Sequence, residues 1–202
     1  MKIKETTQQL VDKIKNILKD QARARIRKNQ PRVRSLIKYE LYNAIYECPE
    51  MESLRSGKLK WDFGLDFDPS MAISEAVSGA FKTKYIENQS TVAQFEIDIQ
   101  PLSYLEVLEL PEAVQITERG EVLPWLEWLL TYGSTIVCID GFGVKYASAG
   151  RSGGAVMIEG YNFGQPFMVD PLYAGTKGDN FITRAISANK DKIIGAAWEI
   201  IK

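Results

Sequence analysis

Residues 121–133, "EVLPWLEWLLTYG", predict a short helix with one strongly apolar face. Pro124 suits the first turn of a helix, where a backbone N–H has no partner inside the helix, and the closing glycine suits the position after its end. Trp125, Trp128 and Leu129 are spaced i, i+3 and i+4, so they share one face. We predict that this face is buried in the core, against a sheet.

Strand patterns lie on both sides of this helix. Residues 91–100, "TVAQFEIDIQ", alternate apolar and polar side chains, which is typical of a strand with one buried surface. After the helix come "STIVCID", "GVKYA", "AVMIE" and "FMVD", separated by glycine or turn residues. This spacing predicts an antiparallel meander. Residues 58–65, "KLKWDFGL", have a short alternating core and predict one further strand.

Helical patterns occupy both ends of the chain. In residues 1–30 apolar side chains recur every three or four positions, and we expect Pro31 to break or kink this helix. A second helix is predicted directly after it. A third is expected to begin at Asp68 or Ser70, and a fourth at about Asn180, capped by this residue or by the aspartate before it.

The order of these elements predicts the fold class. Helices come first, a mixed region follows, and strands with a closing helix come last, which favours α+β over alternating α/β. We expect N-terminal helices packed with a small antiparallel sheet and a C-terminal helix. Residues 1–30 are predicted to form a basic helical arm, and residues 31–202 a single α+β domain.

Charge is unevenly distributed along the chain. Residues 1–38 hold 12 basic and 3 acidic residues, whereas residues 39–202 hold 13 and 23. No carboxylate lies between Asp20 and Glu40, so we expect the basic residues of the arm to be uncompensated within their helix. Two interpretations stay open, a solvated face and a surface that contacts phosphate backbone or an acidic protein. Four of these residues stand four apart and form the basic stripe: Lys15, Lys19, Arg23 and Arg27.

The residue types argue against catalysis and metal binding. The chain contains no histidine, which is the commonest general base and metal ligand. Residues 147–158, "ASAGRSGGAVMI", lack the lysine of a phosphate-binding loop, and the chain lacks the histidine that the serine of a nucleophile elbow needs. We therefore predict no catalytic residue, no cofactor and no bound metal. The paired acids Glu96/Asp98 and Asp66/Asp68 are interpreted as solvated.

The sequence also predicts where the chain is found. No apolar run approaches the roughly 18 residues needed to span a bilayer, so we expect no membrane partner. The charges of the first ten residues are not followed by the apolar core of a secretory signal. Cys48 and Cys138 have no ligand-type neighbours and are expected to be reduced, half-buried thiols of a protein made in the cytoplasm.

Four segments together resemble a group of tailed-bacteriophage virion proteins. These proteins belong to the neck or tail-completion type and are related to minor tail protein Z. The resemblance covers roughly residues 40–188. The segments are, in order, "YECPEMESLRSGKLKWDFGL" (46–65), "LPWLEWLLTYG" (123–133), "RSGGAVMI" (151–158) and "PLYAGTKGDNFITRAI" (171–186).

The resemblance implies a structural protein of the virion, made in the host cytoplasm. Such subunits form a homo-oligomeric ring between the portal–connector and the tail tube, and no catalysis is implied. The expected partners are the portal or connector, the tail tube or terminator proteins, and DNA in the channel through non-specific contacts. A loop with two adjacent glycines lets a neighbouring backbone come close. The expected subunit-contact loop is therefore Arg151, Ser152, Gly153 and Gly154.

Other functions stay open at this point. A tail-terminator ring protein would have a similar size and an α+β outline. A small nucleic-acid-binding protein would use the basic N-terminal helix, although the remainder of the chain is acidic and the tryptophans lie on an apolar face. An enzyme without histidine would need a pair of carboxylates in a suitable setting, and no pair in the sequence has one.

Overall fold

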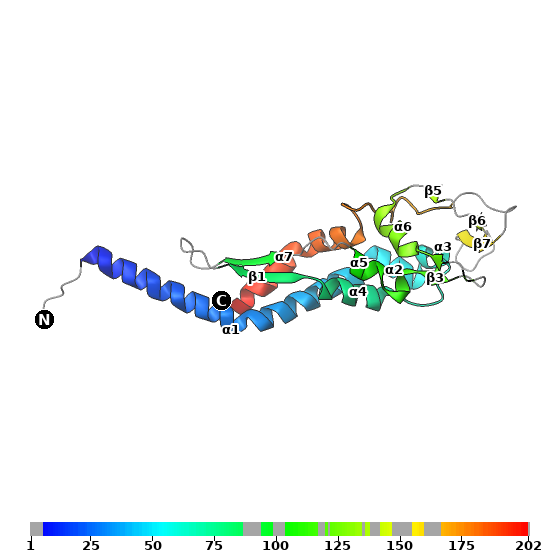
Figure 1. Ribbon diagram of the computed structural model, residues 1–202. Coiled ribbons are helices and arrows are strands. Elements are labelled where there is room, and N and C mark those ends of the chain that lie inside the picture. The colour runs from blue at the N-terminus through cyan, green and yellow to red at the C-terminus, as the bar shows by residue number, and fades with distance from the viewer. Residues whose placement is uncertain are drawn as a thin grey trace.

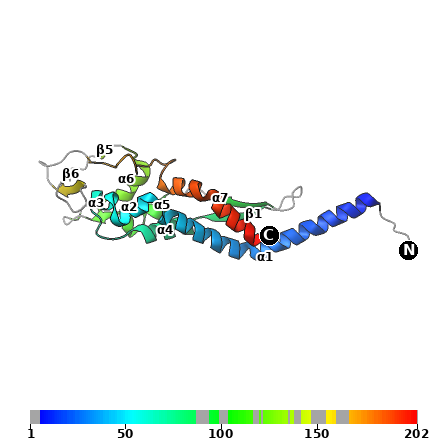
Figure 2. The same cartoon turned by 180° about the vertical axis from the view of Figure 1, so that it is seen from behind.

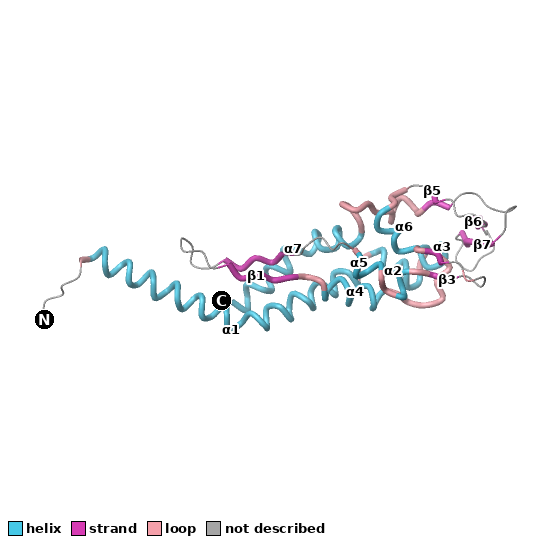
Figure 3. The backbone as a smooth tube through the Cα atoms, viewed as in Figure 1, coloured by secondary structure: helices cyan, strands magenta, loops and turns pink. Residues whose placement is uncertain are grey.

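The computed structural model describes residues 6–86, 94–98, 104–116, 120, 122–134, 136–137, 142–146, 155–159 and 167–201. Together they form an elongated molecule built mainly of helices (Figures 1 and 3). The helices are α1 (Thr7–Tyr46), α2 (Pro49–Ser56), α3 (Lys58–Asp62), α4 (Ser70–Gly79), α5 (Leu105–Leu108), the 3-10 turn η1 (Pro111–Ala113), α6 (Trp125–Thr131) and α7 (Phe181–Ile201). The strands are β1 (Lys82–Ile86), β2 (Gln94–Asp98), β3 (Gln115–Ile116), β4 (Val122–Leu123), β5 (Ile136–Val137), β6 (Phe142–Tyr146), β7 (Ala155–Glu159) and β8 (Phe167–Met168).

α1 dominates the molecule. It has 40 residues, so it is about 60 Å long. No glycine interrupts it, and Thr6 starts it with a capping box, in which the Thr6 hydroxyl accepts from the Gln9 N–H and the Gln9 side chain accepts from the Thr6 N–H. The N-terminal part projects from the body, whereas the C-terminal part lies against α4 and α7 (Figures 1 and 2).

The helix is not broken at Pro31. It continues to Tyr46 and bends in the region where the C-terminal end of α7 lies beside it (Figure 1). Proline lacks the N–H of one intrahelical hydrogen bond. Burial of Ile26 before it, and of Val33 and Ile37 after it, stabilises the helix on both sides of this gap. The predicted boundary between residues 30 and 31 therefore falls inside one continuous helix.

The core consists of two apolar clusters that are mainly helical. The smaller one joins α1 to α7 and includes Val33, Ile37 and Ile193. The larger one gathers residues of α2 to α6 and the start of α7, including Trp125. The predicted burial of the α6 face is confirmed, because Trp125, Trp128 and Leu129 are all buried. In the larger cluster this face lies together with residues of α2 to α5, and its predicted packing against a sheet stays a prediction.

The described strands form four antiparallel pairs: β1 with β2, β3 with β4, β5 with β8, and β6 with β7. An α+β fold in this broad sense agrees with the prediction, although helices predominate and the strands are short. The predicted meander is wrong, because β5 pairs with β8 and encloses the β6–β7 hairpin in sequence. Alternating residues identify a strand, but they do not identify its partner.

Residues 58–62 form a helix, although a strand was predicted over residues 58–65. Lys58–Asp62 is α3, and Leu59 and Phe63, four positions apart, are both buried in the larger cluster. The Leu59 N–H donates to Ser53 Oγ at 3.0 Å, so α2 supplies an acceptor at the start of α3. Residues four positions apart share one face in a helix and also in a strand, so the spacing of Leu59 and Phe63 does not distinguish the two.

Asn180 is the residue that starts α7. Its Oδ1 accepts from the N–H groups of Ile182 and Thr183 at 3.1 and 3.2 Å. Its Nδ2 donates to the Tyr104 hydroxyl at 2.7 Å and to the Thr176 carbonyl at 2.9 Å. Asn180 is fully buried, so this one side chain caps the helix and ties it to the segments before α5 and α7.

We expect Asn180→Ala to lower the free energy of unfolding by about 2–3 kcal/mol, because it removes a helix cap and leaves buried polar groups without partners. Asp179→Ala is the matched control. The Asp179 side chain is exposed and pairs with Arg184 at 3.3 Å, so its loss should cost less than about 1 kcal/mol. Urea denaturation followed by circular dichroism measures both. Equal losses would contradict the assignment of Asn180 as the cap.

Candidate subunit interface

The basic stripe lies along the projecting part of α1. Lys15 and Arg27 are exposed, whereas Lys19 and Arg23 are only partly exposed. An Arg23 nitrogen lies 3.6 Å from Asp20 Oδ1, one turn earlier. The expectation of an uncompensated stripe is therefore wrong, and the middle of the stripe is not a simple solvated face. An exposed pair of this kind contributes at most about 1 kcal/mol, so the arm keeps its strongly positive character.

An apolar face lies on the other side of the same helix segment. Its large side chains are open to solvent, with Ile14 54% and Ile17 56% exposed. At 3.6 residues per turn this face is roughly 170° around the helix from the centre of the basic stripe. One flat partner surface cannot contact both faces together. The exposed residues of the apolar face are Leu10, Val11, Ile14, Ile17 and Leu18.

The apolar face continues into a groove against α7. A cavity of about 470 Å³ lies between Leu18, Ala22 and Ile26 of α1 and Trp198 and Ile201 of α7. Trp198 is 60% exposed, although it is the largest side chain of the groove. The end of α7 therefore extends the apolar surface of the arm toward the body.

The sequence pattern of α7 contained a signal for this groove. Ile193 and Ala197 are buried, but Ile194 and Trp198, one position further on, are exposed. Apolar residues at i, i+1, i+4 and i+5 cover a wider part of the helix than one packing partner can bury. Ile193 and Ala197 occupy the part that is buried, and Ile194 and Trp198 occupy the part that stays exposed.

The exposed apolar side chains of the arm form a candidate interaction surface. Burying one leucine or isoleucine side chain stabilises a protein by about 1.5–3 kcal/mol, and the arm leaves several open. Monomeric proteins rarely expose contiguous apolar surface of this kind unless it is an interaction site. The arrangement fits contact with an apolar protein surface.

The predicted contact loop, Arg151, Ser152, Gly153 and Gly154, lies outside the described residues. The strands that flank it in the sequence, β6 and β7, pair with Tyr146 opposite Ala155. Its assignment as a subunit contact stays a prediction.

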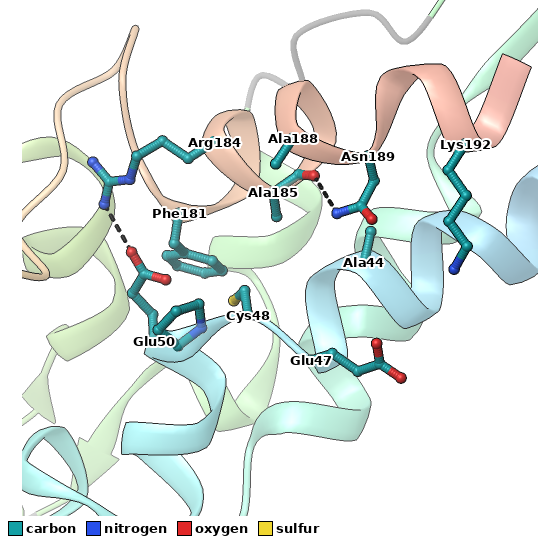
Figure 4. A pocket seen from close by; sticks show the side chains of 11 residues that line it. Ala44, Glu47, Cys48, Glu50, Phe181, Arg184, Ala185, Ala188, Asn189 and Lys192 are labelled. Carbon is teal, nitrogen blue, oxygen red and sulfur yellow. Dashed lines mark hydrogen bonds and ion pairs between the residues drawn. The ribbon is translucent and has the colours of Figure 1, made fainter.

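A second hollow, of about 400 Å³, lies where the end of α1 and the start of α2 meet α7 (Figure 4). Two of the cations that line it, Arg184 and Lys192, form ion pairs across the helices. Arg184 contacts Glu50 at 2.9 Å, and Lys192 contacts Glu40 at 3.0 Å. These pairs hold α7 to α1 and α2.

Cys48 lines the same hollow but is not an activated thiol. It is 7% exposed and unpaired, and burial raises the pKa of its thiol to about 11. The thiol therefore stays protonated at neutral pH, which is typical of a structural cysteine. Its burial is more complete than predicted, and Cys138 lies outside the described residues.

Lys58 forms another tie between distant segments. Its Nζ lies 3.0 Å from Asp62 Oδ2 and 2.8 Å from Asp170 Oδ2, although the last two residues are far apart in sequence. The hydrogen bond from Lys58 lowers the pKa of the Asp170 carboxyl below its ordinary value. The ion pair between Lys58 and Asp170 joins α3 to the segment after β8.

In comparisons with known proteins, no family model, curated protein or solved structure matches the chain. Among the helices that the structure describes, none has the length and apolar character to cross a membrane. In the same residues, no three potential ligand side chains are grouped to hold a metal ion.

Proposed function

We propose that this protein is a structural virion protein of a tailed-bacteriophage neck, of the tail-completion type. Copies of the chain assemble into a ring between the portal–connector and the tail tube, and they act without catalysis. The observation that carries this proposal is the exposed apolar face on a helix that leaves the body. A ring subunit contacts its neighbour through two different patches, and a projecting helix supplies one of them.

Three of the four segments that resemble the phage proteins pack together in the body of the molecule. Parts of three of the similar segments, 46–65, 123–133 and 171–186, meet in the larger apolar cluster. Backbone contacts also join them, since the Gly175 N–H donates to the Leu129 carbonyl at 3.0 Å. These three segments therefore belong to one packed body.

The basic stripe supports a second candidate, a small nucleic-acid-binding protein. Four cations in a row attract phosphates in a salt-dependent way. In the ring, an arm that docks by its apolar face leaves the stripe for another partner, including DNA in the channel. A tail-terminator ring would use the same apolar contact between subunits. It would differ from a tail-completion ring in its position in the virion and not in how it assembles.

The mass of the protein in solution separates the first two candidates. We expect light scattering after size-exclusion chromatography to show a discrete assembly of several chains without DNA. Its mass should not depend on added duplex DNA. A monomer whose elution shifts only when DNA is present would contradict the ring and support the nucleic-acid-binding candidate.

We predict that Ile17→Asp weakens this assembly at least about tenfold, because a charge replaces an apolar contact worth about 1.5–3 kcal/mol. Ile17 is exposed in the subunit, so the melting temperature of the isolated chain should not fall. Asn16→Asp, exposed on another side of α1, is the matched control and should assemble normally. Loss of assembly in the control alone would show that the apolar face is not the contact.

A further inference from the structure

Along one side of α1, two exposed isoleucines are followed by two basic residues nearer the body. At 3.6 residues per turn, Arg25 and Lys28 lie on the same side as Ile14 and Ile17, away from the basic stripe. Both are exposed, and Arg25 lines the groove with Trp198. Neither forms an ion pair with another described residue. A surface that fits this side must therefore offer apolar contact with carboxylates close by.

The body of the same chain carries such a surface on α4 and α5, which contact each other. Leu105 is 58% exposed at the start of α5. Glu106 and Glu109 of α5 and Glu75 of α4 are also exposed, and none of the three is ion-paired within the described part of the chain. Residues 104–116 contain no lysine or arginine, so the carboxylates keep their full negative potential.

The arm cannot reach this surface on its own subunit. α4 packs against the C-terminal part of α1, and the arm projects in the opposite direction along the same helix (Figure 1). A continuous helix of about 60 Å cannot fold back on itself. The complementary surfaces can meet only between two copies.

Pairing between two arms is disfavoured by charge. Residues 6–30 hold seven basic and two acidic residues, a net charge of +5. Two arms packed by their apolar faces would bring these like charges together, which opposes association. An acidic acceptor removes this repulsion.

We infer that the arm of one copy docks on the acidic α4–α5 surface of the next copy. Ile14 and Ile17 pack beside Leu105, and Arg25 and Lys28, which lie further along the same side of the arm, are attracted by the carboxylates of α4 and α5. This inference rests on the proposed ring, and it names the acceptor that the ring contact uses. Donor and acceptor are different patches of one chain, which is the arrangement that closes a ring.

A charge swap tests the inference. Arg25→Glu with Lys28→Glu, and separately Glu106→Lys with Glu109→Lys, should each weaken assembly at least about tenfold. Chains that carry all four changes should recover most of the lost affinity. Lys15→Glu with Arg27→Glu alters the net charge equally on the other side of α1, and it should weaken assembly less.

The outcomes separate this inference from the proposed function. Suppose that the chain with all four substitutions assembles no better than either chain with two, while the wild-type chain forms rings that Ile17→Asp disrupts. The proposed acceptor surface is then wrong, and the proposed ring is not contradicted. If the wild-type chain is monomeric at all concentrations, both are wrong. If Lys15→Glu with Arg27→Glu weakens assembly as much as Arg25→Glu with Lys28→Glu, the effect is one of net charge and not of docking.

Disulfide trapping gives a second measurement that does not depend on affinity. Chains with Ile17→Cys are mixed with chains with Leu105→Cys and oxidised mildly. We expect a mixed dimer on a non-reducing gel, because the two positions meet between copies. Dimers formed by the Ile17→Cys chain alone would show arm–arm pairing and overturn the inference.

Discussion

Trp125→Ala should lower the free energy of unfolding by about 3–5 kcal/mol, the usual cost of removing a large aromatic side chain from a packed core. Trp125 is fully buried in the larger cluster. Its ring centre lies 5.4 Å from that of Phe63, and its Nε1 donates to the Glu112 carbonyl at 3.1 Å. The substitution therefore removes packing between α6 and α3 and also leaves a carbonyl without its donor.

Trp198→Ala is the control for this prediction. Trp198 is 60% exposed at the mouth of the groove, so its loss should cost the monomer less than about 1 kcal/mol. Chemical denaturation at low protein concentration compares the two variants. Losses below about 1 kcal/mol for both Trp125→Ala and Trp128→Ala would show that the α6 face is not a core surface.

Gly175→Ala should cost about 3 kcal/mol or more, at the upper end of the range for overfilled cores. A Cβ at this position would lie 2.5 Å from the Asn180 Cβ and 2.9 Å from the Leu129 carbonyl oxygen. The Leu129 carbonyl also accepts from the Gly175 N–H at 3.0 Å, so relief of the clash would break this hydrogen bond. The new methyl group would separate the end of α6 from the start of α7.

Gly178→Ala is the matched glycine substitution three residues later. Nothing lies within 4 Å of a Cβ at Gly178, so this change should be close to neutral. Thermal unfolding of the two variants measures the difference directly. A Gly175→Ala protein as stable as Gly178→Ala would mean that the loop between β8 and α7 can move away from α6.

The elements that depend on neighbouring residues could be predicted from the sequence. α6 begins after Pro124 and ends before Gly133, whose φ of +64° suits glycine. α7 begins after Asn180, because the side chain of that residue reaches N–H groups only two and three positions ahead. Such signals act within one helical turn, so no distant segment is needed to explain them.

Elements that depend on distant partners could not be predicted in this way. Residues 58–62 form a helix because α2 and the larger cluster cover one helical face. β5 pairs with β8 across about thirty intervening residues, and nothing in either two-residue strand specifies that partner. Both results depend on contacts between segments that only the folded chain brings together.

The arm shows most clearly the difference between what local sequence predicts and what tertiary contacts decide. The sequence by itself determined a basic helix with an apolar side, because the spacing of Ile14, Lys15 and Ile17 places both isoleucines away from the lysine around a helix. Only the tertiary structure decided that Ile26 is buried while Ile17 stays open. Ile17 and Ile26 are nine positions apart and lie on opposite sides of α1. The end of α7 lies beside Ile26, so the body covers that side and leaves Ile17 exposed. Periodicity sets the direction of a side chain, but burial requires a surface to meet it.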